Sequence, residues 1–143
     1  METTLETIQT FLKQYGWESE SPEAGLVVTE FRGKTGVFRL FVQLVRDWVI
    51  LVIVPFVPKP LQGCETRFLQ ALIRANYEMN LVKIGIDNEG DVALTVELPN
   101  SDPTYKNFAL ALDALSTYAD LYYLPLSNLA TDPSYHLPLE LGI

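Results

Sequence analysis

The chain has 143 residues, which is the usual size of one domain and is enough to bury most of its apolar surface in a single core. With 48% hydrophobic and 20% charged residues, the composition excludes an intrinsically disordered chain. The net charge is −8, from 18 acidic and 10 basic residues, and it repels phosphate backbones, so we expect no nucleic-acid partner.

The first predicted element is a helix over residues 5–15, where apolar side chains recur at spacings of three and four before Gly16 ends it. A polar, proline-containing connection follows, in which no strand is predicted. Alternating or continuous apolar residues then predict strands at 26–31, 37–45 and 48–57, joined by short turns.

The strand at 48–57 is apolar on both faces. One face carries Trp48, Ile50, Val52 and Val54, and the other carries Val49, Leu51 and Ile53. Because helices are expected on one side of the sheet only, the second set needs another cover. We therefore expect Val49, Leu51 and Ile53 to form an interaction surface, either for a second copy in a homodimer or for a partner. The alternative is that the chain beyond Pro125 folds back over them.

The second half of the chain predicts a helix, a hairpin and a further helix. The second helix ends near Asn80, and its apolar stripe consists of Phe68, Leu69, Leu72, Ile73 and Met79. Alternating residues predict the hairpin strands 82–86 and 92–98. The third helix is expected to start at the capping sequence 101–103, Ser-Asp-Pro, and to end at Pro125.

The order of the predicted elements indicates an α+β domain: one helix, three strands, a helix, two strands and a helix. We expect an antiparallel sheet of about five strands with the helices mainly on one face. The domain is assigned to residues 1–128, and residues 129–143 form a proline-containing tail.

Three observations suggest a cytoplasmic protein without a membrane partner. The longest apolar run, within residues 48–57, is about half of the roughly 20 residues that a membrane helix needs. The N-terminus is acidic and amphipathic, unlike a secretory signal. The single cysteine, Cys64, also excludes an intrachain disulfide.

Two turns invite comparison with ligand-binding loops, and neither has the required residues. The turn at 33–35, Gly-Lys-Thr, lacks the earlier glycine and the following helix of a phosphate-binding loop, so we predict a hairpin turn. Asp87, Glu89 and Asp91 follow the first spacings of a calcium loop, but its sixth position is not glycine and its twelfth is Leu98. We predict a solvated turn there.

Catalytic and metal-binding groups are scarce. Cys64 and His136 are the only cysteine and histidine, which is too few for a metal cluster, and neither has a base-orienting neighbour in sequence. A pair of carboxylates among the 18 acidic residues stays open. We expect no catalytic residue, no cofactor and no metal.

Asn76 falls on the apolar stripe of the second helix. A carboxamide there must satisfy its donors and acceptors, so we expect it to bond the backbone of the neighbouring hairpin, with a ligand contact as the alternative. Asn80, at the expected end of the helix, is also given a structural role.

The second helix and the hairpin carry a resemblance to a known family through three segments: Ala75-Asn76-Tyr77-Glu78-Met79-Asn80, Val82-Lys83-Ile84-Gly85-Ile86-Asp87 and Asp91-Val92-Ala93-Leu94. With the acidic-capped final helix, they resemble the YbjN family, described as a "putative bacterial sensory transduction regulator", over about residues 3–128, and look like its cyanobacterial subgroup. The resemblance implies a type III secretion chaperone-like fold, α-β-β-β-α-β-β-α. It also implies a small, cytoplasmic, often dimeric protein-binding module without known catalytic residues.

We therefore expect a non-enzymatic module that binds another polypeptide, as a chaperone-like or regulatory adaptor. The main alternative is a small-molecule sensor with its ligand between the helices and the sheet. An enzyme that uses carboxylates is the third reading.

Overall fold

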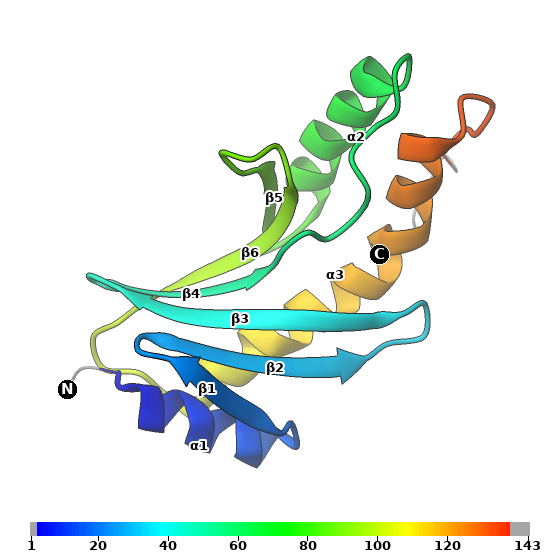
Figure 1. Ribbon diagram of the computed structural model, residues 1–143. Helices are drawn as coiled ribbons and strands as arrows, with labels where there is room; N and C mark the ends of the chain where they lie inside the picture. The colour runs from blue at the N-terminus through cyan, green and yellow to red at the C-terminus, as the bar shows by residue number, and fades with distance from the viewer. Residues whose placement is uncertain (1–2, 138–143) are drawn as a thin grey trace.

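The computed structural model describes residues 3–137 of the chain (Figure 1). These residues form an α+β domain whose six-stranded antiparallel sheet has the order β1-β2-β3-β4-β6-β5. The elements are α1 (Leu5–Tyr15), β1 (Ser19–Glu23), β2 (Leu26–Arg32), β3 (Val37–Val45), β4 (Trp48–Ile53), α2 (Glu65–Glu78), β5 (Lys83–Ile86), β6 (Val92–Pro99) and α3 (Tyr105–Thr131). The predicted class and antiparallel sheet are confirmed, with one strand more than expected.

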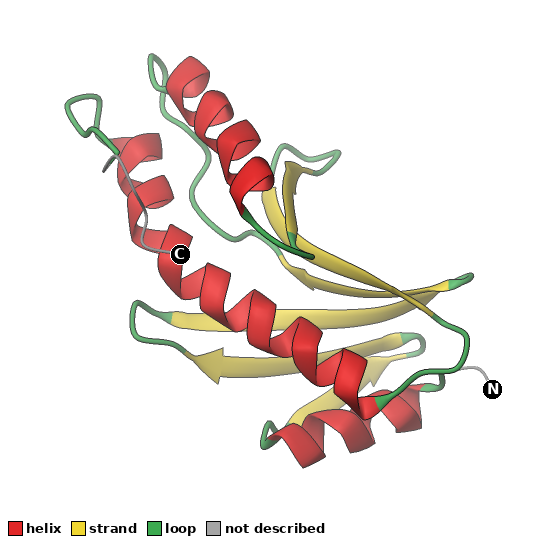
Figure 2. Ribbon diagram, turned by 180° about the vertical axis from the view of Figure 1, so that it is seen from behind, coloured by secondary structure: helices red, strands yellow, loops and turns green. Residues whose placement is uncertain are grey.

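The three helices of the described residues lie on one face of the sheet. Figure 2 shows α3 crossing this face diagonally, with α1 near its N-terminal half and α2 near its C-terminal half. In addition, α1 contacts β1 and β2, and α2 contacts β5. Figure 1 looks onto the opposite face, on which no described helix lies. The core therefore lies between one layer of helices and one layer of strands, and the other sheet face is open.

The inward face of β4 is central to the core. Val49, Leu51 and Ile53 are only 3%, 0% and 2% exposed, and they pair with inward-facing residues of β6. The three residues expected at an interaction surface are thus covered by the helices of the same chain. The structure corrects the assignment of the two faces of β4, because periodicity shows which residues share a face but not which face the helices cover.

A strand, β1, occupies the segment that was expected to be a polar connection. Its residues are largely exposed and have no apolar alternation, so hydrophobic periodicity could not indicate it. Backbone pairing with β2 holds the strand in place, and the Thr29 hydroxyl donates to the Glu18 carbonyl at 2.6 Å just before it begins. Pro22 and the surrounding charges suit an edge strand, since they discourage further pairing.

The ends of α3 differ from the prediction. Thr104, rather than a residue of the expected capping sequence 101–103, caps the helix, and its hydroxyl accepts a hydrogen bond from the Asn107 amide at 3.1 Å. At the other end the helix continues through Pro125 to Thr131, so the expected stop was wrong. An interior proline costs about 3 kcal/mol, but burial of Leu126 and Leu129 recovers roughly 1.5–3 kcal/mol each.

Arg67 of α2 also stabilises the C-terminal end of α3. Its guanidinium donates to the carbonyls of Leu129, Asp132 and Tyr135, at 3.4, 3.1 and 2.6 Å. These carbonyls lie at or after the end of the helix, where intrahelical partners run out. The division into a domain of residues 1–128 and a tail of residues 129–143 stays a prediction, and residues 138–143 lie outside the described part. None of the described helices is long and apolar enough to cross a membrane.

Candidate functional site

The outer side of α2 carries three exposed hydrophobic side chains. Leu69, Ile73 and Tyr77 are 42%, 72% and 92% exposed, and their four-residue spacing places them on one side of the helix. We call these three residues the α2 outer stripe. The inner side of α2 is buried through Phe68, Ala71, Leu72 and Ala75. The sequence placed Leu69 and Ile73 on the buried stripe, and the structure corrects both, because adjacent apolar residues leave the direction of the stripe open.

The open face of the sheet has an apolar centre. Val28, Phe41 and Val52 form one row across β2, β3 and β4, and Ile50 lies on the same face of β4. Val28 is buried and the other three are half-buried. The Arg39 guanidinium lies 5.4 Å from the centre of the Phe41 ring, close enough for a cation–π contact. We call Val28, Phe41, Ile50 and Val52 the outer sheet face.

Charged residues border this apolar centre. Glu30 of β2 pairs in register with Arg39 of β3, and Lys83 of β5 forms an ion pair with Glu97 of β6. An apolar strip with a charged border has the composition of a protein-binding surface. The sequence had suggested an interaction surface on β4, but on the opposite face, whose residues lie in the core.

Asn76 binds the edge strand β5, as predicted. Its Nδ2 donates to the Ile84 carbonyl at 2.8 Å, and its Oδ1 accepts from the Ile84 amide at 2.7 Å. In an antiparallel strand both backbone groups of one residue point the same way, so at Ile84 they face away from β6. The carboxamide therefore satisfies two groups at the free edge of the sheet. The prediction of a structural hydrogen bond is met, although Asn76 is an exposed residue.

Asn80 acts through its backbone. Its amide donates to the Tyr118 hydroxyl at 2.9 Å, and its carbonyl accepts from the Val82 amide at 2.7 Å. One turn further along α3, the Tyr122 hydroxyl donates to Glu78 at 2.9 Å. Burial, and then the Glu78 carboxylate, raise the pKa of Tyr122 above its usual value. Two tyrosines of α3 thus fix the end of α2.

The turn at residues 33–36 holds a carboxylate of its own chain. Asp120 of α3 accepts hydrogen bonds from the amides of Lys34 and Thr35, at 2.9 and 3.0 Å, and from the Thr35 hydroxyl at 2.9 Å. A Cβ on Gly33 would lie 2.2 Å from an Asp120 oxygen. Burial acts to raise the pKa of Asp120, but the hydrogen bonds from Lys34 and Thr35 outweigh it and the pKa is lowered. The predicted hairpin turn is confirmed, and these amides are occupied.

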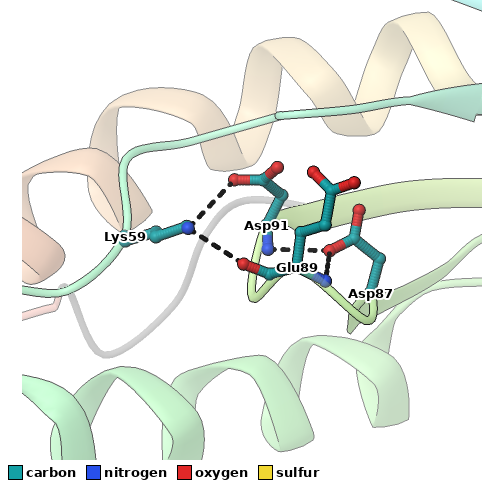
Figure 3. Close-up of polar contacts among 4 residues, drawn as sticks. All are labelled: Lys59, Asp87, Glu89 and Asp91. Atoms are coloured by element: carbon teal, nitrogen blue, oxygen red, sulfur yellow. Dashed lines mark hydrogen bonds and ion pairs between the residues drawn. The ribbon is translucent and has the colours of Figure 1, made fainter.

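The turn between β5 and β6 is organised by its first aspartate. Figure 3 shows Asp87 Oδ1 accepting from the amides of Glu89 and Asp91, both at 2.9 Å, and Lys59 approaching from the segment before α2. The Lys59 ammonium donates to the Glu89 carbonyl at 3.0 Å and lies 3.6 Å from Asp91. In residues 3–137 no group of three or more His, Cys, Asp or Glu side chains is placed to hold a metal ion.

The remaining candidates for chemistry are dispersed. Cys64 is buried at the N-terminal end of α2, and His136 is exposed after α3. Burial and a hydrogen bond to Asp113 raise the pKa of Tyr15 to about 12, and the two side chains join α1 to α3. Hydrogen bonds from Ser134 lower the pKa of Asp132 just after α3. The groups with a shifted pKa thus have structural partners.

Solved structures with this arrangement of helices and strands define the class of fold. One chain of the heterodimeric ExoU-SpcU complex from the type III secretion system of Pseudomonas aeruginosa is 18% identical, with a TM-score of 0.61 over 89% of this chain and 99% of that chain. A chain of the HopA1-SchA chaperone-effector complex is 12% identical, with a TM-score of 0.53 over 78% and 85%. The protein has a type III secretion chaperone-like fold.

The particular family follows from the sequence match. The model of the YbjN family, described as "Putative bacterial sensory transduction regulator", matches residues 4–127. The chain therefore belongs to the YbjN family, and the resemblance expected from the sequence is confirmed. The crystal structure of YbjN from E. coli, called a putative transcription regulator, is 14% identical, with a TM-score of 0.59 over 90% of this chain and 89% of that chain. A search of curated proteins finds no match.

Proposed function

We propose that this protein is a non-enzymatic, cytoplasmic binding module that holds another polypeptide as a chaperone-like or regulatory adaptor. The observation that carries the proposal is apolar surface that no described helix covers, namely the exposed α2 outer stripe and the half-buried outer sheet face. Covering a side chain such as Ile73 contributes roughly 1.5–3 kcal/mol. The shared fold with chains of chaperone-effector and other heterodimeric complexes supports the same reading.

The α2 outer stripe suits a twofold homodimer. Leu69 and Tyr77 lie four residues before and after Ile73, so an antiparallel pair of α2 helices centred on Ile73 would place Leu69 of one protomer against Tyr77 of the other. Such an interface is self-complementary, as a twofold axis requires. The homodimer we propose uses this stripe, in place of the face of β4 that the sequence favoured.

The outer sheet face suits the second polypeptide. It is broad, half-buried and bordered by both acidic and basic groups, so a bound segment could combine apolar contact with charge pairing. Tyr15, Asp120 and Tyr122 have shifted pKa values, but each is bonded to a structural partner away from this face. A binding role therefore explains the apolar outer sheet face, whereas the groups with shifted pKa values do not form a catalytic site on it.

The test is affinity capture from an extract of the source cells, with bound proteins identified by mass spectrometry. We expect the parent to retain a defined polypeptide and Val52→Glu to lose it, because the new charge would be buried at the interface. Leu124→Glu makes a similar change at an exposed leucine of α3 and should retain it. Retention of the same polypeptide by Val52→Glu, or no specific retention by the parent, would contradict the proposal.

A further inference from the structure

A cavity of about 240 Å³ lies where α1, the start of α3 and the β4–β6 pair meet. Its apolar wall is formed by Phe11, Val49, Leu98 and Phe108, which come from four different elements. Val49 and Leu98 are direct partners in the β4–β6 register. Because the wall comes from packed helices and strands, it is held rigidly. An apolar cavity that water fills poorly offers a favourable place for an apolar ligand.

Two leucines extend the apolar surface to the rim of the cavity. Leu81, in the loop after α2, and Leu110, on α3, are 50% and 57% exposed. The backbone beside the cavity is also strained, since Leu81 has φ 69° and Asp102 has φ 50°, values that favour glycine. Strained residues of this kind cluster at functional sites, where the surrounding structure holds them. The exposed leucines and the strained backbone at the rim therefore support treating this cavity as a candidate site.

We propose that this cavity is a binding site for a neutral, mainly apolar small molecule about the size of one or two fused rings. An apolar cavity of about 150 Å³ in another protein binds benzene, and pockets for drug-sized ligands measure roughly 300–1,000 Å³, so this volume lies between the two. Asp102 is the only charged residue among the described residues that line it, and its sign disfavours an anion. Ser101 and Asn107 can bond one polar group of the ligand.

The site is independent of the proposed polypeptide binding, because neither the α2 outer stripe nor the outer sheet face contributes to its lining. It gives the small-molecule alternative a location between helices and sheet. The ligand would contact both the start of α3 and the loop after α2. Each proposal can therefore fail without the other.

Indole is a suitable probe, because it is neutral, bicyclic and carries one hydrogen-bond donor. We would titrate it into the isotope-labelled full-length protein and follow the backbone amides by NMR. The expected result is saturable shifts that cluster at the cavity-lining residues. Indole-3-acetate, an anion with the same rings, should bind at least several-fold more weakly.

Leu98→Phe, which fills the cavity, should reduce the affinity for indole at least tenfold. Val49→Leu is a milder filling variant for use if Leu98→Phe does not keep the parent's spectrum, and Val37→Leu makes the same change at an exposed valine of β3, outside the cavity lining, as the control. The control should bind indole as the parent does. The proposal is overturned if indole gives no saturable shifts at the cavity, or if a folded filling variant binds it as tightly as the parent.

Discussion

Asn76 of α2 forms two hydrogen bonds with one residue, Ile84, and both use backbone groups at the free edge of β5. The side chain thus takes the place that a neighbouring strand would otherwise occupy. It joins helix to sheet and also protects an edge that could pair with another chain.

We predict that Asn76→Ala lowers the free energy of unfolding by about 1–3 kcal/mol, because the Ile84 amide and carbonyl lose their partners. Urea unfolding followed by circular dichroism would measure the loss. Asn80→Ala is the matched control, since the described bonds of Asn80 come from its backbone, and it should change stability by less than about 0.5 kcal/mol. Equal stability of Asn76→Ala and the parent would show that the contact is not structural.

The contact between Asp120 and the turn at 33–36 predicts a dependence of stability on pH. The pKa of Asp120 is lowered in the folded state, so its contribution is present above the unfolded pKa of about 3.9 and is lost as the pH falls through the folded value. Asp120→Asn should cost about 1 kcal/mol near neutral pH, allowing for solvent screening, and the difference from the parent should shrink in acid.

Urea unfolding of both proteins at several pH values between about 7 and 3 would measure this difference. Asp47→Asn, at an exposed aspartate in another turn, is the control and should show no comparable pH-dependent loss. A constant difference between Asp120→Asn and the parent at every pH would argue against a contribution from the charge.

Gly33→Ala tests the close approach of the same turn to α3. The added Cβ would lie 2.2 Å from an Asp120 oxygen, so the Asp120 carboxylate or the turn must shift, and the hydrogen bonds between them would be disturbed. We expect a destabilisation of about 1–3 kcal/mol by thermal unfolding. Gly36→Ala is the control in the same turn, because its Cβ would meet its nearest neighbour at 3.6 Å. Similar melting of the two variants would be inconsistent with this account.

The proposed homodimer predicts that Ile73→Glu produces folded monomers. Ile73 is at the centre of the α2 outer stripe and is exposed in one chain, so the substitution should leave the fold intact and place a charge in the interface. Light scattering coupled to gel filtration would give the mass of the parent, of Ile73→Glu and of the Leu124→Glu control. A monomeric parent, or a dimeric Ile73→Glu, would refute this interface.

Arg67→Ala should loosen the last turn of α3. Without the guanidinium, the carbonyls of Leu129, Asp132 and Tyr135 lose a charged donor. The helix after Pro125 would then be stabilised only by the burial of its apolar side chains. We expect faster amide hydrogen exchange near the end of α3 and a loss of about 1–2 kcal/mol. Arg74→Ala, an exposed arginine on the same helix, is the control. Unchanged exchange in Arg67→Ala would show that burial alone holds the turn.

Much of the fold could be predicted from local patterns. Apolar periods of three to four and of two located α1, the β2–β3–β4 region and the β5–β6 hairpin, because these elements are amphipathic and their periods differ. The same patterns missed β1, whose exposed residues carry no period. These patterns also predicted that α3 ends at Pro125. A local rule does not take account of the buried leucines and Arg67, which stabilise the helix beyond the proline.

Local patterns in the sequence were sufficient to show which strand residues share a face, that Asn76 needs a hydrogen-bonding partner, and that the turns at 33–36 and 87–90 lack the residues of phosphate and calcium loops. Which side of β4 and of α2 faces outward depends on tertiary packing. An amphipathic period fixes the relation of residues within one element, whereas direction depends on how distant elements pack. For the same reason Val49, Leu51 and Ile53 lie in the core, while Ile73 and Tyr77 are exposed.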